Sequence, residues 1–270
     1  MPELPEVETT VKSLNILKNK KVIKLDAHIE KLRYPLPIKK LKKIINTKII
    51  NLRRIAKYII LDFNNSYSLI IHLGMSGRLK IIKSDIPRVK HDHLVILFDK
   101  NYQLIFNDPR RFGFVDLIET NKINTIKYIK ILGIDALDKN LTSNYLYKRI
   151  NKSNIPIKQL LLNQHIVAGI GNIYASEILY DAKISPLRRG RQLDKYQIGT
   201  IIKSTRKILK KSIKFGGSTI NDYISPDGTL GNFQNNFKVY GREGSKIKGI
   251  FIKKVVLYGR STFYCPKIQK

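Results

Sequence analysis

The first residues of the chain could supply a nucleophile. An initiator methionine before a small residue is normally removed, so Pro2 would become the amino terminus. Its nitrogen is then a secondary amine, and because α-amino groups have a pKa of about 8, a neutral fraction exists at physiological pH. Such an amine can attack a sugar carbon and form an iminium intermediate. Glu3, or Glu6 one helical turn on, could shuttle the proton. Taken alone, this segment is more simply an ordinary solvated terminus.

Two loops could present an apolar side chain next to an arginine. Residues 71–77 (IHLGMSG) hold Met75 in a turn that contains two glycines, and residues 107–113 (NDPRRFG) hold Arg110 and Phe112 after a proline turn. An apolar wedge can fill the gap that a flipped-out base leaves, while the arginine pairs with the orphaned partner. Each apolar side chain could instead pack in a core, and its sequence alone leaves both alternatives open.

Two more segments could bind phosphate. A Gly-x-Gly break in residues 167–179 (VAGIGNIYASEIL) puts Asn172 at the start of an expected helix, where it could cap the helix or help to hold a phosphate. Arg260 could grip a phosphate with two N–H groups, although it is one of 51 Lys and Arg residues.

The composition favours a polyanionic partner and excludes a membrane span. The chain has 270 residues and a net charge of +31, which attracts nucleic acid. Part of the lysine excess could instead reflect AT-rich codons. No apolar run reaches the roughly 18 residues that cross a bilayer, and the acidic, proline-rich start is unlike a signal peptide. One cysteine, Cys265, fits a reducing compartment. We therefore expect a soluble cytoplasmic protein without membrane contact.

Hydrophobic periodicity divides the chain near Gly133. A helix is expected over residues 5–19, and the segment before Gly133 then reads mostly as short strands, at residues 57–63, 68–73, 78–83, 94–98 and 103–106. The next segment has helical periodicity at residues 125–132, 142–151, 156–164, 173–182, 194–214 and 219–223. Residues 247–256 and 257–265 read as a β-hairpin.

Together these motifs resemble bacterial formamidopyrimidine-DNA glycosylase, also known as 8-oxoguanine DNA glycosylase and abasic-site lyase. The matching stretches run in the family's order along the whole chain, and two of them, MPELPEVET at residues 1–9 and VAGIGNIYASE at residues 167–177, are highly specific. The others are RRIAKY at 53–58, HLGMSG at 72–77, KHDH at 90–93, DPRRFG at 108–113, GGST at 216–219, VYGR at 239–242 and STFYC at 261–265.

The resemblance implies an α+β multidomain fold. It consists of an N-terminal β-sandwich with an N-terminal helix (residues 1–132), a helix-two-turn-helix domain (133–230) and a C-terminal zinc-finger-like β-hairpin (236–270). It also implies a base-excision repair enzyme that removes 8-oxoguanine and formamidopyrimidines from duplex DNA and nicks the strand by β,δ-elimination. The expected partner is duplex DNA with oxidised purines or abasic sites. We expect a monomer without an obligate protein partner.

The resemblance also carries residue roles to matching positions. Pro2 corresponds to the nucleophile, Glu3 to the acid/base carboxyl, Lys57 to the lysine credited with β-elimination and Arg260 to the arginine credited with δ-elimination. DNA contacts are expected at Glu6, His72, Met75, His91, Arg110, Phe112, Lys152 and Asn172.

The chain departs from the family at two places. The family normally binds one zinc through four cysteines, and here three of them are absent, since only Cys265 remains. One thiolate cannot form a structural zinc site, so we expect no metal and no cofactor. Packing of apolar side chains would hold the hairpin instead, at Ile250, Ile252, Val255, Leu257 and Tyr264. The second departure is Asn221, which replaces a usually basic residue beside the flipped base.

Two alternatives remain open at this point. A related endonuclease VIII-like enzyme would act on oxidised pyrimidines, although the HLGMSG and DPRRFG loops favour the purine branch. A non-catalytic DNA-binding relic would explain the lost cysteines. Against the relic, Pro2, Glu3, Lys57 and Arg260 are all retained.

Overall fold

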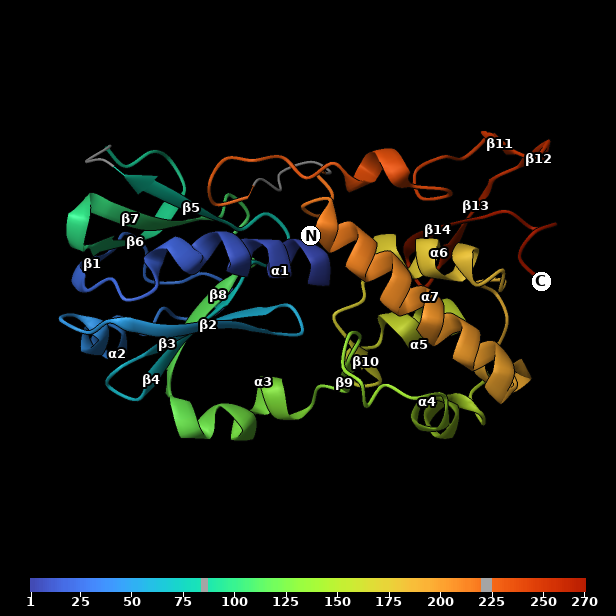
Figure 1. The fold of residues 1–270 in the computed structure, drawn as a ribbon, viewed down its shortest axis with the longest axis horizontal. Coiled ribbons are helices and arrows are strands. Elements are labelled where there is room, and N and C mark those ends of the chain that lie inside the picture. The colour runs from blue at the N-terminus through green and yellow to red at the C-terminus, as the bar shows by residue number, and fades with distance from the viewer. Residues whose placement is uncertain (84–86, 220–224) are drawn as a thin grey trace. The chain divides into compact units, whose positions relative to one another are not determined.

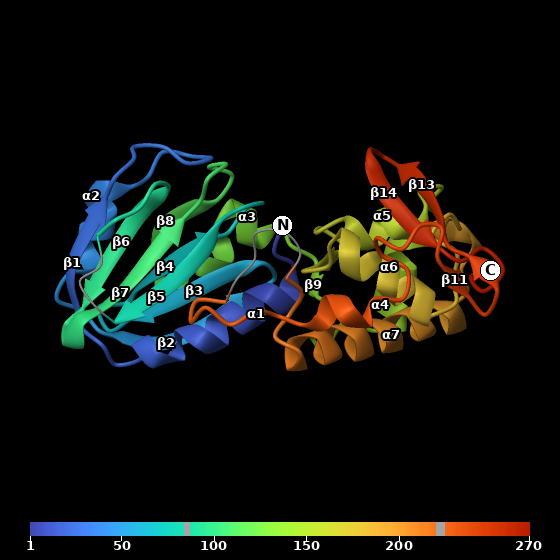
Figure 2. The ribbon, with the colours of Figure 1, turned by 90° about the horizontal axis from the view of Figure 1, so that it is seen from above.

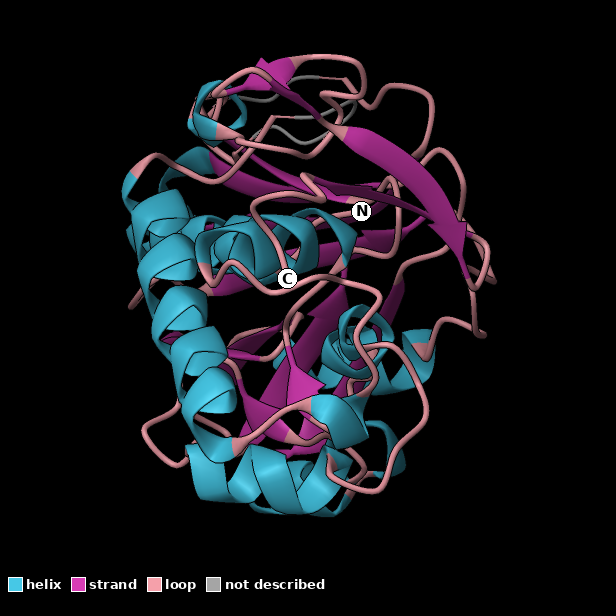
Figure 3. Ribbon diagram, turned by 90° about the vertical axis from the view of Figure 1, so that its right-hand side faces the viewer, coloured by secondary structure: helices cyan, strands magenta, loops and turns pink. Residues whose placement is uncertain are grey.

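The computed structural model describes residues 1–83, 87–219 and 225–270, and Figure 3 draws the remaining residues in grey. The chain forms two compact units. Unit 1 comprises residues 1–130 and 215–234, and unit 2 comprises residues 131–214 and 235–270. Residues 215–230, which the sequence analysis counts with the helical domain, therefore group with the sandwich. Each unit is described by itself.

Unit 1 is a β-sandwich of two four-stranded antiparallel sheets (Figures 1 and 2). One sheet has the order β1-β6-β7-β5 and the other β2-β3-β4-β8. The strands are β1 (Val22–Ala27), β2 (Ile49–Ile55), β3 (Tyr58–Phe63), β4 (Tyr67–His72), β5 (Arg78–Lys83), β6 (Asp92–Phe98), β7 (Tyr102–Asn107) and β8 (Phe114–Glu119). The expected α+β fold class is confirmed.

Aliphatic and aromatic side chains from both sheets form one core in unit 1. Alternate residues of β3, such as Ile59 and Leu61, meet Leu94 and Ile96 of β6 in this core, because successive side chains of a strand point to opposite faces. Helix α1 (Leu4–Ser13) contributes Val7 and packs against β2 and β3. Unit 1 also contains the short helices α2 (Ile38–Leu41) and α3 (Lys127–Lys130) and 3₁₀ helices at Leu14–Leu17, Lys42–Ile44, Asp99–Asn101 and Thr120–Thr125.

Unit 2 is built from four α-helices (Figure 1). These are α4 (Ser143–Ile150), α5 (Ile157–Leu162), α6 (Asn172–Asp181) and α7 (Lys195–Lys214). The two-residue strands β9 (Ile134–Asp135) and β10 (Val167–Ala168) pair in parallel. Helix α6 packs against α5 and α7 and carries the buried side chains Tyr174 and Ile178.

The C-terminal segment of unit 2 forms two hairpins, where the sequence analysis expected one. β11 (Lys246–Ile247) pairs with β12 (Ile250–Phe251), and β13 (Lys253–Leu257) pairs with β14 (Arg260–Tyr264). The expected turn between residues 256 and 257 is wrong. Tight turns instead use positive φ angles at Lys248 (50°) and Gly249 (75°), and at Tyr258 (49°) and Gly259 (72°).

Other elements match the expected positions to within a few residues, except for the helix α2 and five strands. The strands that were not expected are β1, β2, β8 and the two-residue strands β9 and β10. Two of them, β1 and β2, carry many exposed or half-buried side chains, with burial confined to positions such as Val22 and Ile49. Pairing with neighbouring strands defines them, and this long-range information is absent from local periodicity. The helix expected over residues 219–223 lies largely outside the described residues.

Candidate active site

The start of α1 holds the candidate nucleophile in a fixed position. Glu3 is the N-cap residue, and its side chain and that of Glu6 form a reciprocal capping box with the backbone. The Glu3 N–H donates to Glu6 Oε2 at 2.9 Å. Pro2 and Glu3 are buried while Met1 is 46% exposed, so loss of Met1 would uncover the Pro2 nitrogen at a rigid helix end.

Glu6 links this helix end to the loop that follows α7. Its Oε1 accepts hydrogen bonds from the Ser218 N–H at 2.8 Å and from the Ser218 hydroxyl at 2.9 Å. An added Cβ on Gly217 would lie 3.1 Å from the same oxygen, which favours glycine there. Glu6 is only 2% exposed. This geometry gives Glu6 the task of positioning the terminus, and does not fit the expected contact with DNA.

Lys57 lies in the two-residue turn between β2 and β3. Ala56, the first residue of the turn, has a φ of 51°. Arg54 accounts for the turn's position: its Nε donates to Glu8 Oε2 on α1 at 2.8 Å, and its Nη1 donates to the Ala56 carbonyl at 2.8 Å. The Arg54 side chain therefore ties the turn of Lys57 to the helix that begins beside Pro2.

His72 ends β4 directly opposite the Lys57 turn, because it pairs with Tyr58 in the sheet. Its ring stacks on Phe114 at 5.7 Å between centroids. Burial, together with the positive charges of Lys57 and Arg33, lowers the pKa of His72 to about 4. The imidazole is therefore neutral at physiological pH. Its Nδ1 accepts the Gly74 N–H at 3.1 Å, which leaves Nε2 as the protonated nitrogen.

The loops of residues 71–77 and 107–113, which we call the wedge loops, interlock next to His72. Gly74 has a φ of 63°, and a Cβ there would lie 2.4 Å from the Phe112 carbonyl carbon, so only glycine permits this approach. Met75 is 44% exposed and Phe112 is 43% exposed. The guanidinium carbon of Arg110 lies 4.9 Å from the Phe112 ring centroid. Core packing is thus excluded for both apolar side chains.

Asp108 joins these loops through buried hydrogen bonds. Its Oδ1 accepts from the Ser76 hydroxyl at 2.6 Å, and its Oδ2 accepts from the Gly113 N–H at 2.8 Å. The Arg110 N–H in turn donates to Ser76 Oγ at 3.1 Å. One carboxylate therefore sets the relative position of the Met75 loop and the Phe112 loop.

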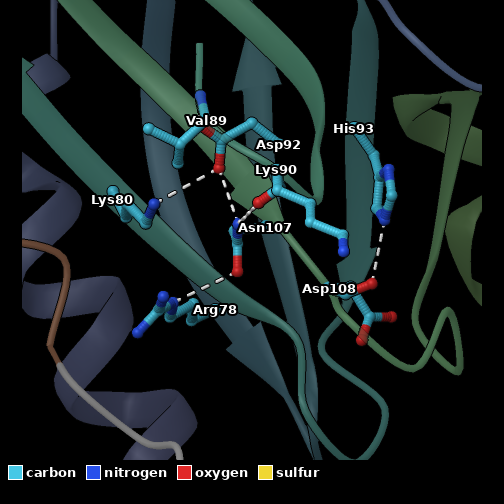
Figure 4. A network of polar contacts seen from close by, with 8 residues as sticks. All are labelled: Arg78, Lys80, Val89, Lys90, Asp92, His93, Asn107 and Asp108. Carbon is cyan, nitrogen blue, oxygen red and sulfur yellow. Dashed lines mark hydrogen bonds and ion pairs between the residues drawn. The ribbon is translucent and has the colours of Figure 1, made fainter.

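A second network, drawn in Figure 4, supports His91. Asp92 accepts from Asn107 Nδ2 at 2.7 Å, from Lys80 Nζ at 3.2 Å and from the Val89 N–H at 3.1 Å. These bonds hold the turn in which His91 has a φ of 71°. The His91 carbonyl accepts the Asp108 N–H at 3.1 Å, so the turn of His91 is joined to the loop of Arg110.

In unit 2, the Ser261 carbonyl joins Asn172 to the strand that carries Arg260, and so connects the two candidate phosphate-binding residues. Ser261 O accepts from Asn172 Nδ2 at 3.0 Å and from Lys158 Nζ at 3.0 Å. Lys158 Nζ also donates to Thr262 Oγ1 at 2.8 Å and is 1% exposed as a residue. Arg260 directly precedes Ser261 and is exposed. These bonds fix the β14 strand, and hence Arg260, against the starts of α5 and α6.

The structure corrects one expectation about Asn172. Gly171 is the N-cap of α6 and Asn172 is its first residue, so the Asn172 side chain is not the helix cap. It reaches the hairpin instead, and its Oδ1 is buried without a hydrogen-bond partner among the described residues. An orphaned buried oxygen beside a helix start is consistent with a ligand-binding position.

Lys158 was not among the residues expected from the sequence, whereas Lys152 was expected as a DNA contact. Lys152 is exposed after α4. The available signal for Lys158 was a lysine on the apolar face of a short helix, one turn from Leu161 and Leu162, where a charged residue needs partners. Asn221 lies outside the described residues.

The C-terminal hairpins do not fit a zinc site. Cys265 is fully buried, and its Sγ lies 4.0 Å from the Ile250 carbonyl. No cluster of three or more His, Cys, Asp or Glu side chains able to hold a metal occurs in residues 1–83, 87–219 and 225–270. The buried centre is Val239, Ile252 and Phe263. Of the five expected packing residues, Ile252 belongs to this centre, Tyr264 is also buried, and the other three are half-buried.

A carboxylate on α6 anchors the chain that enters these hairpins. Glu177 is 2% exposed and accepts backbone N–H groups of Lys238 at 2.8 Å, Val239 at 2.9 Å and Tyr240 at 2.8 Å. The pKa of Glu177 is raised, because the effect of burial exceeds that of the three hydrogen bonds, which lower it. At the other end, Cys265 N–H donates to Gln269 Oε1 at 2.8 Å.

Comparison with known proteins gives one consistent result. The family model for the formamidopyrimidine-DNA glycosylase N-terminal domain matches residues 1–115, and that for the family's H2TH domain matches residues 132–223. The formamidopyrimidine-DNA glycosylase of Zymomonas mobilis is 44% identical over 272 residues, with 100% of both chains covered.

Among the helices formed by described residues, none is long and apolar enough to cross a membrane.

Solved structures agree over the full length. A Lactococcus lactis Fpg mutant in complex with Fapy-dG-containing DNA has a TM-score of 0.92 at 36% identity, with both chains fully covered. MutM in complex with DNA containing carbocyclic 8-oxo-G has a TM-score of 0.90 at 36% identity, again with 100% of both chains covered.

Proposed function

Because this chain belongs to the formamidopyrimidine-DNA glycosylase family, we propose that it removes oxidised purines from duplex DNA, with the Pro2 amine as nucleophile, and then nicks the strand. The chain is by family a DNA glycosylase and abasic-site lyase. The substrates are 8-oxoguanine and formamidopyrimidine nucleotides in duplex DNA, and abasic sites. The enzyme acts as a monomer in the bacterial cytoplasm.

The observation that carries the proposal is the pair of interlocked loops with exposed tips. Removal of a base from a duplex requires that the nucleotide leave the stack, and the vacated space must be filled. Met75 and Phe112 are large apolar side chains held in the open by Gly74 and Asp108. Exposure of such side chains in a rigid setting costs solvation free energy without any benefit to folding, which favours insertion into DNA.

The chemistry begins at the Pro2 nitrogen. Its lone pair forms a bond to C1′ of the extruded sugar, the glycosidic bond breaks, and its electrons leave with the base, which takes up a proton. Glu3 then protonates the ring oxygen as the C1′–O4′ bond opens and the nitrogen loses its proton, which leaves an iminium. The cap at α1 holds Pro2 and Glu3 in a fixed geometry and so lowers the entropy cost of this step.

Strand nicking follows from the acidity of the iminium. Loss of a C2′ proton forms a double bond as the C3′–O bond breaks and the 3′ phosphate departs. Loss of a C4′ proton then expels the 5′ phosphate, and water hydrolyses the iminium to free Pro2. Lys57 assists the first elimination and Arg260 the second, since each provides a cation for a departing phosphate. His72 Nε2–H, His91, Arg110 and Asn172 bind the surrounding DNA.

Paired lesion substrates test this function. The expected result is excision of 8-oxoguanine and formamidopyrimidine from duplexes opposite cytosine, with nicked products that carry phosphate at both ends. A preparation that retains Met1 should excise neither. Excision confined to oxidised pyrimidines would contradict the proposal in favour of the endonuclease VIII-like alternative. Duplex binding without any excision, with Met1 removed, would favour the non-catalytic relic.

We also propose that the C-terminal hairpins fold without zinc. The donor set supports this, because Cys265 is the only cysteine in the chain and a structural site needs about four ligands. The apolar centre around Val239 and the carboxylate of Glu177 supply the contacts that orient the segment. Metal analysis after a chelator wash should find no stoichiometric zinc, and the melting temperature should not change with chelator. Stoichiometric zinc that is lost in Cys265→Ser would contradict this proposal.

A further inference from the structure

The loop between β1 and α2 brings an unassigned arginine to the wedge loops. In residues 28–37, Lys31 and Pro35 form an antiparallel bridge, so the chain reverses at Arg33 and Tyr34. Leu32 is 5% exposed and Leu36 is 7% exposed, and both lie in the sandwich core. Two buried leucines therefore flank the tip and force it outward.

The tip is fastened directly to the Phe112 loop. The Arg33 N–H donates to the Gly113 carbonyl at 3.1 Å. The Tyr34 ring contacts Phe114 edge to face at 5.6 Å, although Tyr34 remains 54% exposed. The guanidinium carbon of Arg33 lies 5.6 Å from the Tyr34 ring centroid, within the range of a cation–π contact.

Arg33 is a cation without a carboxylate partner in the part of the chain that the structure describes. It is exposed, and its N–H bonds to Gly113, the neighbour of Phe114, which pairs with His72 in the sheet. Burial raises the pKa of Tyr58 and lowers that of His72, and the positive charge of Arg33 lowers both pKa values. Its charge therefore adds to that of Lys57, and an uncompensated guanidinium here raises the local affinity for phosphate.

We propose that Arg33 binds a backbone phosphate of the DNA next to the wedge, with Tyr34 as the positioning residue that orients the guanidinium. The inference rests on the proposed function for the identity of the polyanion. Arg33, Lys57 and His72 then form a phosphate-binding edge on unit 1, adjacent to the loops that carry Met75 and Phe112. The contact reads the backbone, so it strengthens binding without selecting a base sequence.

Salt-dependent binding tests the contact. The probe is a short fluorescent duplex with a tetrahydrofuran abasic-site analogue, titrated with full-length protein at several salt concentrations. The logarithm of the binding constant falls linearly with the logarithm of the salt concentration, and loss of one phosphate contact makes this slope less steep by about 0.9. Arg33→Ala should show this decrease and bind about tenfold more weakly at roughly 0.1 M salt. Arg33→Lys should retain the slope.

The controls separate a contact from a general loss of charge. Lys31→Ala removes an exposed cation two residues away and should leave the slope and affinity within about twofold of wild type. Tyr34→Phe should match wild type, whereas Tyr34→Ala should lose part of the slope at an unchanged melting temperature. A slope for Arg33→Ala equal to that of Lys31→Ala would overturn the inference. Wild-type excision, measured in parallel, reports separately on the proposed function.

Discussion

Glu6 and Ser218 lie 212 positions apart in the chain, and two hydrogen bonds of 2.8 and 2.9 Å join them. The other oxygen of the same carboxylate accepts the Glu3 N–H at 2.9 Å. The buried Glu6 side chain thus holds the amino terminus and the loop after α7 together. In each of these three hydrogen bonds Glu6 is the acceptor. A carboxylate fits this role because both of its oxygens accept.

Replacement of Glu6 by glutamine should therefore loosen the terminus. Gln has one accepting oxygen, so either the Glu3 N–H or the Ser218 N–H faces an amide NH₂ and loses its partner. An unsatisfied buried donor costs about 1–3 kcal/mol, and the melting temperature should fall by several degrees. Thermal unfolding measures this loss. Ser218→Ala removes only the hydroxyl bond and should have a smaller effect. Equal stability of Glu6→Gln and wild type would refute this role.

Gly74→Ala tests the interlocking of the wedge loops. The added Cβ would lie 2.4 Å from the Phe112 carbonyl carbon at a φ of 63°, so the two loops must separate. Excision from duplex DNA should fall by about tenfold to a hundredfold, while cleavage of a single-stranded abasic site should change less. Gly199→Ala in α7, where nothing lies within 4 Å, is the matched control and should behave as wild type. Normal duplex excision by Gly74→Ala would contradict the proposal that the wedge loops fill the gap left by the flipped nucleotide.

Lys158→Met tests how the hairpin is docked. The change removes the bonds to Ser261 O and Thr262 Oγ1 and leaves Asn172 as the remaining donor to Ser261. Arg260 is the first residue of β14, so it should shift when the strand loses these bonds. We therefore expect δ-elimination, which depends on Arg260, to decrease more than β-elimination, which depends on Lys57 in unit 1. Gel separation of the two products measures this ratio. Lys203→Met, which changes an exposed lysine of α7 in the same unit, should leave the ratio unchanged. An unaltered ratio in Lys158→Met would remove Lys158 from this role.

His72 should make folding stability depend on pH. Its pKa is lowered to about 4 in the folded chain against about 6.5 unfolded, so between these values the unfolded state binds more protons. Its contribution is complete above about pH 6.5 and declines as the pH falls toward 4. Denaturant unfolding of His72→Gln, whose amide oxygen can still accept the Gly74 N–H, should show a smaller loss of stability from pH 7 to pH 5 than wild type. Parallel pH curves for the two proteins would contradict the shift.

Local patterns predicted the elements that carry their own periodicity. Strands such as β3 and β4 are rich in β-branched residues, and α7 repeats buried positions at Ile198, Ile201 and Ile202. β1 and β2 were missed because exposed or half-buried side chains, among them Lys24, Arg53 and Arg54, interrupt their apolar pattern. Their strand geometry comes from pairing with β6 and β3.

The candidate site was predictable where motif and geometry coincide. Glycines at 74 and 113 permit the close approach of the wedge loops, and their motifs point to this region. Lys158 and Arg33 escaped notice because their roles depend on contacts with Ser261 and Gly113, which lie far away in the chain. The sequence left open whether Asn172 caps the helix or helps to hold a phosphate, since Asn is a good cap. The actual N-cap is Gly171, and the bond from Asn172 to the hairpin is a tertiary feature that local sequence does not reveal.

Borohydride trapping tests whether Pro2 is the nucleophile. Protein with Met1 removed is mixed with a duplex that carries 8-oxoguanine opposite cytosine, and the reduced complex is analysed by denaturing gel and by mass spectrometry of its N-terminal peptide. We expect a covalent adduct at Pro2 that is absent when Met1 is retained. An adduct on a lysine, or none despite base excision, would contradict Pro2 as the nucleophile.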